Sequence, residues 1–358
     1  MKVLLVSGSF PPMKCGVGDY SRSLAEALAS LPAVEVAVLT GNAARPPAAS
    51  DGFRVFPVMR RWGLSEALKV FKVIWQWSPD VIHIQYPTQG YANGALPWLL
   101  PLIALAMGKK VVQTWHEGYA GRDLPKLLGK LIVPGPVVVV RSQYLEKLHP
   151  VLRRIVSKKR LVFIRNASSI PRVELSDQEK IDKRRQYLKH QKRLIVFFGF
   201  VYAFKGVDIL FEVADPATDQ IVIAGAIDEN DDFSKKILRM VATAPWSGKV
   251  VITGFLPALE IASLLAVADA VILPFKTGAG EWNTSIHAAV LNGTFVLTTS
   301  LNGNGYNHEL NVYYANVDNI QEMRDALEKY IGRRREYNPG IDIHEWKQIA
   351  FEHFSLYQ

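Results

Sequence analysis

The ten residues FFGFVYAFKG at positions 197–206 run from an apolar stretch into Gly199, through a loop, and into Lys205 and Gly206 at the start of a predicted helix. A strand, a glycine-bearing loop and a helix N-terminus form a natural anion site, because free backbone N–H groups and the helix dipole both favour negative charge. Lys205 adds a mobile positive charge of the kind that phosphates attract. An ordinary strand-to-helix turn with a surface lysine is the competing interpretation when this stretch is taken alone.

A second loop of this type lies near the N-terminus, at residues 9–20 (SFPPMKCGVGDY), and precedes a predicted helix. Gly16 and Gly18 allow the backbone to approach a ligand closely. The loop has neither the G-x-G-x-x-G dinucleotide pattern nor a P-loop pattern, which disfavours nicotinamide or ATP binding. Two phosphate-friendly loops in one chain predict a nucleotide held between two domains.

Composition and length are those of a two-domain α/β protein. The chain has 358 residues, of which 49% are apolar and 21% are charged, enough for two separate cores. The single Cys15 excludes an intramolecular disulfide, and the N-terminus is more typical of a first strand than of a signal peptide, so we expect a cytoplasmic protein. Residues 92–108 are the most membrane-like stretch, but Pro97 and Pro101 interrupt it and it is short for a span. A buried helix is expected there, with an interfacial or re-entrant segment as the alternative.

The positive charge is concentrated in the first half of the chain. Residues 1–165 contain 22 Lys and Arg against 9 Asp and Glu, whereas the remainder contains 20 against 24. A basic surface of this kind binds anionic lipid, nucleic acid or a phosphorylated substrate, and a solvated helix face is the alternative for any single run. No nucleic-acid-binding motif is present, so no nucleic-acid partner is expected, and the asymmetry favours an anionic membrane surface, with the protein peripheral on its inner face.

Strand-like apolar runs alternate with helical patterns along the chain, which is typical of parallel α/β architecture. Strands are predicted at residues 3–6, 36–39, 81–84, 111–114, 137–140 and 161–164, and again at 194–198, 220–224, 250–253, 270–273 and 294–298. Helices are predicted at residues 21–31, 64–77 and 143–156. The pattern breaks at residues 166–171, and the polar segment 173–192 is predicted to be the interdomain link.

We therefore predict two Rossmann-like domains, residues 1–168 and 169–335, facing across a cleft, followed by an amphipathic helix within residues 336–358. Polar residues lie directly after two of the N-terminal strands. His116 there is able to hydrogen-bond a substrate hydroxyl or to expose its carbonyl, and a histidine that only caps the turn is the alternative. Glu117 is a base or a loop carboxylate, two options that the sequence does not separate. Glu117 and Tyr86 are assigned to the acceptor side, and His83 is expected in the core.

In this context the chain resembles the family 4 glycosyltransferases of GT-B fold over nearly its full length. The motifs that carry the resemblance are, in chain order, the loop with Gly16 and Gly18, the segments 79–83 (PDVIH) and 114–116 (TWH), Asn166, the segment 199–206, the strand and turn 251–256 (VITGFL), the strand 266–275 (AVADAVILPF) and the tail around Trp346. Each motif is loose by itself, but their order and spacing together are fairly specific.

The resemblance implies a nucleoside-diphosphate sugar as donor, retention of anomeric configuration, and no metal or other cofactor. Lys205 would neutralise the diphosphate leaving group. His116 would contact the donor sugar, with its backbone carbonyl facing the anomeric carbon. The turn at Gly254 and Phe255 would hold the nucleobase through backbone contacts. The donor-binding residues implied in this way are Gly16, Gly18, Gly199, Lys205, Gly254, Phe255, Asn283, Thr284 and Ser285, and the catalytic ones are His116, Lys205 and Glu281.

The sequence departs from the family pattern at two places. The arginine expected after Gly199 is Phe200, which removes one of two usual cations, and the second of two expected glutamates falls on Ala288. Glu281 lies one residue from the position of the first glutamate and is either its substitute or a loop carboxylate. Thr284 and Ser285 are expected to cap the following helix and to offer hydroxyls to an anion.

The leading hypothesis is a glycosyltransferase that moves a sugar from a nucleotide donor to a glycan or lipid-linked acceptor in polysaccharide or glycoconjugate synthesis. The departures at Phe200 and Ala288 motivate an alternative, a non-catalytic sugar-nucleotide-binding or partner subunit of a glycosylation complex. A third option is another GT-B chemistry, such as epimerisation of a sugar nucleotide, which would need further cleft carboxylates; Glu117 and Glu281 are the candidates.

Overall fold

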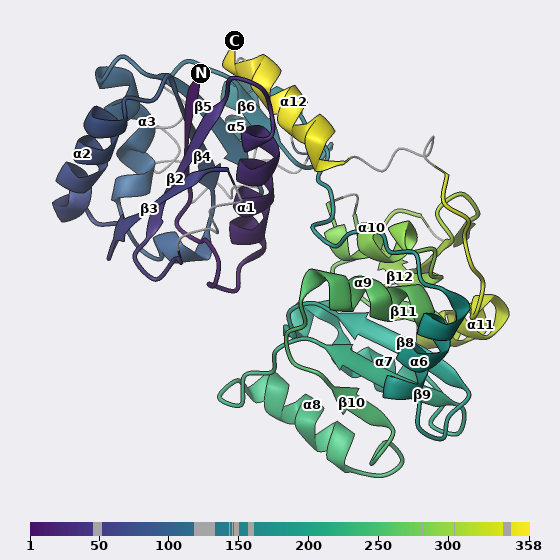
Figure 1. The fold of residues 1–358 in the computed structure, drawn as a ribbon. Coiled ribbons are helices and arrows are strands. Elements are labelled where there is room, and N and C mark those ends of the chain that lie inside the picture. Colours follow the sequence, from purple (N-terminus) through teal and green to yellow (C-terminus); the bar gives the residue numbers. More distant parts are fainter. Residues whose placement is uncertain are drawn as a thin grey trace. The chain divides into compact units, whose positions relative to one another are not determined.

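The computed structural model describes residues 1–45, 52–117, 133–142, 144, 146, 150–156, 161–280, 282–303, 305–338 and 345–358. The chain divides into two compact units (Figure 1), one formed by Met1–Ala167 with His344–Gln358 and the other by Ser168–Ile343. The second unit thus begins one residue before the predicted bound and extends eight residues past the predicted end at residue 335.

The first unit contains a seven-stranded sheet with the order β3-β2-β1-β4-β5-β6-β7, and the strands described in it all pair in parallel. Its strands are β1 Lys2–Val6, β2 Glu35–Gly41, β3 Arg54–Met59, β4 Val81–Tyr86, β5 Lys110–Trp115, β6 Val137–Val139 and β7 Leu161–Phe163. Continuous apolar runs suit such strands, because helices cover both faces of a parallel sheet. The edge strand β3 was not predicted, since Pro57 lies within it and its side chains are only partly buried.

Helices cover the two faces of this sheet separately. On one face, α2 (Ala67–Trp77) and α3 (Leu96–Ala106) share an apolar core with the sheet. On the other face, α1 (Gly16–Ala29) packs against the C-terminal helix α12 (Trp346–Tyr357), and Figure 1 shows the two side by side in purple and yellow. The predicted return of the C-terminal helix to the first domain is therefore confirmed.

The most apolar segment of the sequence forms α3, an eleven-residue helix that contains Pro101 and buries Leu96, Leu100 and Ala104. The helix predicted at residues 143–156 lies partly outside the described residues. Its described part is α5 (Pro150–Val156). None of the described helices is both long enough and apolar enough to cross a bilayer.

The second unit contains a seven-stranded sheet with the order β10-β9-β8-β11-β12-β14-β13, parallel except for β13 at its edge. Its strands are β8 Arg193–Phe198, β9 Asp219–Ala224, β10 Val250–Ile252, β11 Ala270–Leu273, β12 Val296–Ser300, β13 Gly305–Asn307 and β14 Val312–Asn316. The pair β13 and β14 was not predicted. The α/β fold class predicted from alternating strands and helices is confirmed in both units.

The polar segment predicted as a link contains a helix instead. Its helix, α6 (Asp177–Tyr187), begins with a capping box in which the Ser176 side chain and Glu179 bond each other's backbone N–H groups. It packs against α9 (Ala258–Val267), so the segment belongs to the second unit. The other helices of this unit are α7 Val207–Val213, α8 Asp232–Ala242, α10 Thr284–Leu291 and α11 Ile320–Tyr330.

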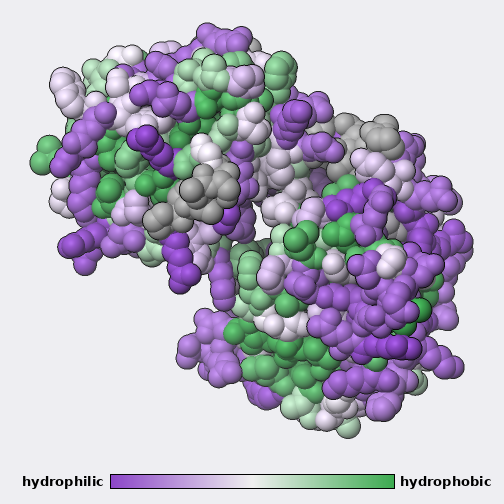
Figure 2. Space-filling view, viewed as in Figure 1, coloured by the Kyte–Doolittle hydropathy of each residue, from purple (hydrophilic) through white to green (hydrophobic). Residues whose placement is uncertain are grey.

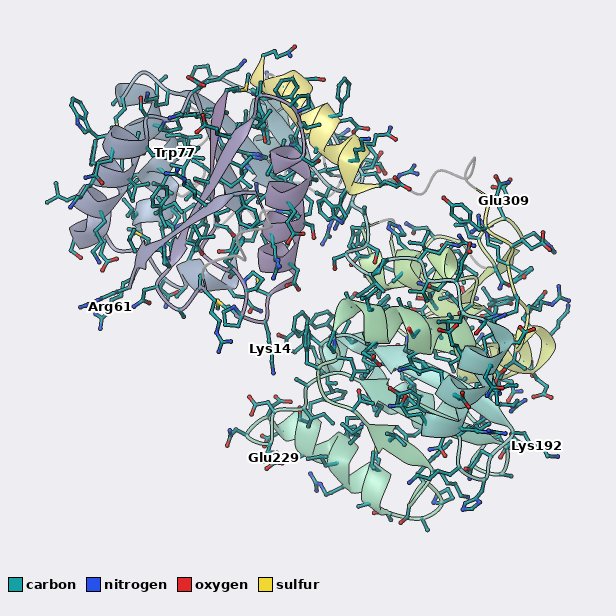
Figure 3. All side chains as sticks on the ribbon, viewed as in Figure 1. Lys14, Arg61, Trp77, Lys192, Glu229 and Glu309 are labelled. Carbon is teal, nitrogen blue, oxygen red and sulfur yellow. The ribbon has the colours of Figure 1, made fainter. Side chains whose placement is uncertain are left out.

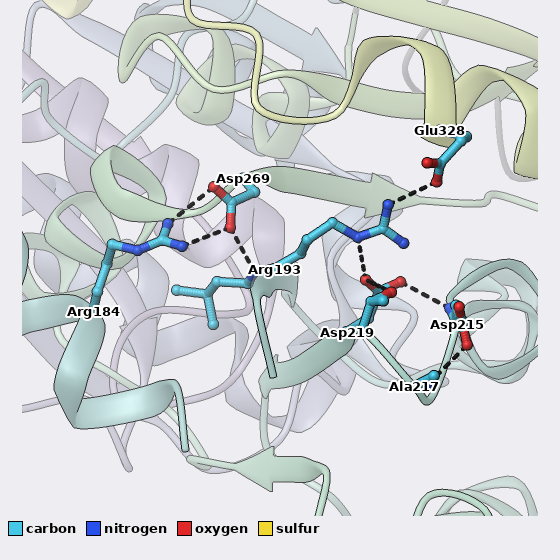
Figure 4. A network of polar contacts seen from close by, with 9 residues as sticks. Arg184, Arg193, Asp215, Ala217, Asp219, Asp269 and Glu328 are labelled. Atoms are coloured by element: carbon cyan, nitrogen blue, oxygen red, sulfur yellow. Dashed lines mark hydrogen bonds and ion pairs between the residues drawn. The ribbon is translucent and has the colours of Figure 1, made fainter. Parts of the chain in front are cut away.

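Ion pairs gather at the amino ends of the strands in the second sheet (Figure 4). Arg184 of α6 binds both carboxylate oxygens of Asp269, just before β11, at 3.0 and 2.9 Å. Arg193, the first residue of β8, pairs with the fully buried Asp219 and with Glu328 of α11. The network joins three strands to two helices at the edge opposite the carboxyl ends, where parallel sheets bind their ligands.

Candidate functional site

Each unit has one topological switch point, the place where the chain stops adding strands on one side of the sheet and continues on the other. In the first sheet it lies between β1 and β4, and in the second between β8 and β11. Ligands of open α/β sheets bind outside the carboxyl ends of the strands at such points. Each unit therefore has a candidate ligand-binding region of its own.

Two glycines bring the loops after β1 and β4 together in the first unit. A Cβ atom on Gly90 would lie 1.9 Å from the Gly8 carbonyl oxygen, and one on Gly8 would lie 2.4 Å from Thr88 Oγ1. The Gly90 N–H donates to Ser9 Oγ at 2.8 Å, which joins the two loops. Sequence reasoning missed both glycines, although each lies in the loop directly after a predicted strand.

Gly16 and Gly18 open helix α1, which no side chain caps at its N-terminus. A Cβ on Gly18 would come within 3.2 Å of the Ser9 backbone, so this glycine permits close packing inside the unit. A Cβ on Gly16 would meet no described atom within 4 Å. Gly16 therefore leaves an open space beside the helix start. Figure 3 shows Lys14, in the same loop, extending away from the ribbon.

His116 lies at the carboxyl end of β5, where its backbone N–H donates to the Tyr86 carbonyl at 2.7 Å. Its Nε2 hydrogen-bonds Gln85 Oε1 at 2.9 Å, and the edge of its ring meets Tyr20 at a centroid distance of 4.7 Å. Burial, together with the positive charge of Arg141, lowers the pKa of His116 to about 3. The imidazole is therefore neutral at physiological pH, with Nε2 as donor to the glutamine oxygen and Nδ1 as acceptor.

A buried polar network connects this region to the C-terminal helix. The Tyr20 hydroxyl and His353 Nε2 are 2.9 Å apart, and the rings of His353 and His83 are 5.0 Å apart. His83 hydrogen-bonds Tyr357 through Nδ1 and Thr114 through Nε2, both at 2.7 Å. Burial lowers the pKa of His353 to about 3 and that of His83 well below its usual value. His83 is buried, as expected, but it also holds α12 on the sheet.

The two acceptor-side residues lie in different surroundings. Tyr86 is fully buried and its hydroxyl donates to the Pro97 carbonyl, so its side chain belongs to the core of the first unit and does not reach the surface of that unit. Glu117 is exposed directly after β5, and its backbone carbonyl accepts a hydrogen bond from the Tyr144 hydroxyl at 2.9 Å. Asp19, which was not singled out, is a further candidate: burial raises its pKa to about 6, opposed by Arg22.

The second unit repeats the glycine arrangement at its own switch point. Gly206 has a φ of +69°, and a Cβ there would lie 2.1 Å from the Pro274 carbonyl oxygen at the end of β11. A Cβ on Gly225, after β9, would lie 2.1 Å from the carbonyl oxygen of Gly199. Gly199 itself has a φ of +122°, which side-chain-bearing residues rarely adopt. Three strand ends thus converge on the loop that contains Lys205.

Lys205 is packed between aromatic rings at this point. Its Nζ lies 4.5 Å from the centroid of the Phe275 ring and 5.5 Å from that of Phe204. Burial lowers the pKa of Lys205 to about 8. Among the described residues no ion pair includes Lys205, whereas Lys236 and Lys276 both bind Asp208, at 2.7 and 3.0 Å. Lys205 is thus a largely buried cation that no carboxylate of the described residues pairs with.

The residue that replaces the expected arginine has a structural role of its own. The ring of Phe200 stacks on Tyr202 at 5.7 Å, and Tyr202 stacks on Phe204 at 5.6 Å, with interplanar angles of 23° and 24°. This aromatic stack (Phe200, Tyr202 and Phe204) ends on the ring that contacts Lys205. The expected second cation is thus replaced by an aromatic side chain that packs on its neighbours in the loop.

Gly254 and Phe255 follow the edge strand β10. Gly254 has a φ of +70° and an open space where a Cβ would be, and the Phe255 side chain is 70% exposed. Thr253 N–H donates to the Ile223 carbonyl at 3.1 Å, which fixes the start of the turn on β9. The nucleobase contacts implied by the resemblance remain a prediction for this turn.

The start of α10 differs from the predicted cap. The N-cap residue is Asn283, and its Oδ1 accepts from the Gly280 N–H at 2.8 Å rather than from the helix. Thr284 and Ser285 lie inside the first turn, so neither is the cap, but no described residue hydrogen-bonds their hydroxyls. Ala288 is completely buried in the apolar core, so this position does not reach a ligand. Glu281 lies outside the described residues.

Thus the structure brings Gly199, Lys205 and Gly206 together at the switch point of the second unit. In the first unit it places Gly16 and Gly18 in the first turn of α1 and His116 directly after β5. Within the described ranges, no group of three or more His, Cys, Asp or Glu side chains is placed to hold a metal ion.

Comparison with known proteins identifies the class. Residues 15–155 match the family model described as "Glycosyl transferase 4-like domain", and no curated protein matches the chain. The whole chain is similar to the sucrose-phosphate synthase of Thermosynechococcus elongatus (17% identity, TM-score 0.75, covering 100% of this chain and 98% of that one). It is also similar to HepE of Anabaena in complex with UDP-glucose (16% identity, TM-score 0.73, 99% of each chain). A third similar structure is the catalytic domain of starch synthase IV from Arabidopsis thaliana bound to ADP and acarbose (13% identity, TM-score 0.69, covering 100% and 98%).

These matches confirm two predictions. The fold over the whole chain is the GT-B fold of glycosyltransferases, and residues 15–155 form a glycosyl transferase 4-like domain. Both findings agree with the resemblance to the family 4 glycosyltransferases, the family model for residues 15–155 and the fold for the whole chain.

Proposed function

We propose that this protein is a retaining glycosyltransferase that moves a sugar from a nucleoside-diphosphate donor to a glycan or lipid-linked acceptor. The observation that carries the proposal is Lys205, a largely buried cation at the switch point that lacks an ion-pair partner among the described residues. Burying a positive charge without a counter-ion is unfavourable unless a ligand supplies the negative charge. The similar HepE structure contains UDP-glucose, a ligand of this charge type.

The roles of the residues follow from the charge that develops during transfer. As the bond between the anomeric carbon and the donor phosphate oxygen breaks, its electron pair passes to the diphosphate. Lys205 stabilises that charge in a partly water-excluded place, where the interaction is stronger than in water. The acceptor hydroxyl oxygen forms the new bond to the anomeric carbon, and its proton leaves with the departing phosphate oxygen.

The first unit contributes uncharged groups in this proposal. The open N-terminus of α1 at Gly16 offers backbone N–H groups to the donor diphosphate or the acceptor. His116 is neutral, so it interacts with sugar hydroxyls or through its carbonyl, without adding charge. No metal is needed in this proposal, because Lys205 and backbone N–H groups neutralise the diphosphate.

A second function, binding of a sugar nucleotide without catalysis, is favoured by one observation. Ala288 lies in the core where the family pattern places a glutamate, so the ribose contact expected from that glutamate is absent. This alternative predicts nucleotide binding without turnover.

A thermal-shift panel of UDP-, GDP-, ADP-, CMP- and dTDP-linked sugars tests the proposal first, since a ligand that binds only the native state raises apparent stability. We expect a shift with one nucleotide class, followed by release of that nucleoside diphosphate when acceptors are supplied. A shift without release with any acceptor tried would favour the binding subunit, and no shift with any donor would contradict both functions.

A further inference from the structure

Helix α2 carries a row of exposed apolar side chains. Leu64, Leu68, Phe71 and Trp75 are exposed to 56%, 79%, 37% and 80%. Leu64 lies in the short 3-10 turn Leu64–Glu66 that continues into α2. Spacings of four, three and four residues put these side chains on one stripe of a helix. We refer to these four residues as the α2 stripe.

The stripe does not serve the core of its own domain. The opposite side of α2 already buries Val70, Val73, Ile74 and Trp77 against the sheet. The helix is therefore apolar on two sides, and one of them faces solvent. Contiguous exposed apolar surface of this kind is rare on monomeric proteins and marks interaction sites.

Helix α3 also exposes apolar side chains. Leu99 and Leu105 are 39% and 41% exposed, and α3 covers the same face of the sheet as α2. Figure 1 shows the two helices side by side, and in Figure 2 hydrophobic residues reach the surface at the outer edge of the domain, where α2 lies.

Positive charges border the stripe. Residues 60–77 contain four basic residues, Arg60, Arg61, Lys69 and Lys72, and a single acidic one, Glu66. Glu66 is already engaged by Lys69 at 2.9 Å and by the backbone N–H groups of both arginines. Arg60, Arg61 and Lys72 are exposed, and Figure 3 shows Arg61 extending away from the ribbon.

We propose that the α2 stripe docks this protein on an anionic lipid bilayer, with α2 lying in the plane of the interface. A helix with leucine, phenylalanine and tryptophan on its solvent side and lysine or arginine beside them has the composition of an interfacial anchor. The bordering cations match anionic headgroups, and the whole 1–165 region has 13 more basic than acidic residues. The inference rests on the α2 stripe and the basic residues around it, and it does not depend on the donor or the acceptor.

Co-sedimentation of the full-length protein with lipid vesicles tests it. We expect binding to vesicles of phosphatidylcholine mixed with phosphatidylglycerol, little binding to phosphatidylcholine alone, and weaker binding at higher salt. The double variant Leu68→Ser with Trp75→Ser should bind about tenfold more weakly. The double variant Arg61→Gln with Lys72→Gln should lose part of the binding and of its salt dependence.

Leu259→Ser is the matched control, because Leu259 is 64% exposed on α9 of the other unit. It should bind vesicles as the wild type does. Since the substituted side chains are exposed, unfolding midpoints of all variants should stay close to that of the wild type. The proposal is overturned if the wild type fails to bind anionic vesicles, or if the Leu68 and Trp75 variant binds them as well as the Leu259 control. It is also overturned if those substitutions separate a dimer while vesicle binding stays unchanged.

Discussion

At both switch points a glycine lies against a backbone carbonyl, but the candidate ligand-binding side chains of the two units differ in charge. In the first unit, Gly90 packs against the Gly8 carbonyl, and in the second, Gly206 packs against the Pro274 carbonyl. In the first unit, the candidate donor-side residue His116 is neutral. The second holds a cation, Lys205, with no counter-ion among the described residues. The fold thus repeats the same glycine packing in both units. In the second unit, Lys205 adds a positive charge at this place.

The largest expected effect comes from removing the cation. Lys205→Ala should lower kcat/KM for the donor by about 100- to 1000-fold, the usual loss when one preorganised group facing a developing negative charge is removed. The melting temperature should hardly change, because Lys205 forms no ion pair with any residue that the structure describes. Steady-state kinetics and thermal unfolding measure the two effects. Lys236→Ala, which removes an exposed partner of Asp208, is the control and should keep full activity; equal losses in both variants would contradict the assignment.

The backbone design is tested by alanine at Gly206. The added methyl group meets the Pro274 carbonyl in a backbone conformation with positive φ, so the free energy of unfolding should fall by about 3 kcal/mol in urea titrations. Gly16→Ala is the matched variant, because its Cβ has open space and an ordinary φ, and it should stay within a few tenths of a kcal/mol of the wild type. A loss of donor affinity in Gly16→Ala would then report on ligand approach. If Gly206→Ala unfolds like the wild type, the loop is not held as described.

The stability of the first unit should depend on pH through its buried histidines. The pKa of His353 is depressed to about 3, so between pH 6.5 and 3 the unfolded chain binds more protons than the folded one and stability falls with pH. From pH 7 to pH 5 one such histidine accounts for a loss of about 2 kcal/mol, if its unfolded pKa is about 6.5. His353→Gln should reduce the pH dependence of the urea midpoint in this window by that amount. An unchanged slope would mean that His353 is charged in the folded protein.

The smallest effect belongs to a single hydroxyl. Tyr357→Phe removes the 2.7 Å hydrogen bond to His83 and should cost about 1 kcal/mol of stability. Affinity for the nucleotide should not change, because this hydrogen bond is buried in the first unit and involves neither Lys205 nor the start of α1 at Gly16. Calorimetric titration with the donor nucleotide and thermal unfolding check both statements. A large change in nucleotide affinity would contradict a purely structural role for this hydrogen bond.

The sequence predicted the parts of this arrangement that depend on local pattern. Lys205 and Gly206 stood out because a strand, a loop and a helix start follow one another within ten residues. The contact of Gly90 with Gly8 could not be predicted from the sequence. The two loops lie about eighty residues apart and are neighbours only because β1 and β4 are adjacent in the sheet. The hydrogen bond between His83 in β4 and Tyr357 in the C-terminal helix was unpredictable for the same reason, because the two residues lie 274 positions apart.

Other differences have local causes. The polar segment around α6 contained a capping box at Ser176 and Glu179, a helix signal that was outweighed by its charge. Tyr86 was assigned to the acceptor side, but β4 is buried along its whole length, so the Tyr86 side chain lies in the core. Phe200 was interpreted only as the loss of an arginine, because stacking with Tyr202 and Phe204 becomes visible once the loop conformation is known.

The central claim, that Lys205 is the cation for the donor diphosphate, is tested most directly by proton uptake on nucleotide binding. With a pKa of about 8, Lys205 is half deprotonated at pH 8, and a bound diphosphate favours its charged form. Titration calorimetry at pH 8 in buffers of different ionisation enthalpy, with the nucleoside diphosphate selected by the donor panel, should show uptake of about half a proton. Uptake should vanish at pH 6 and in Lys205→Ala. Binding without proton uptake at pH 8, or the same uptake in Lys205→Ala, would contradict the account.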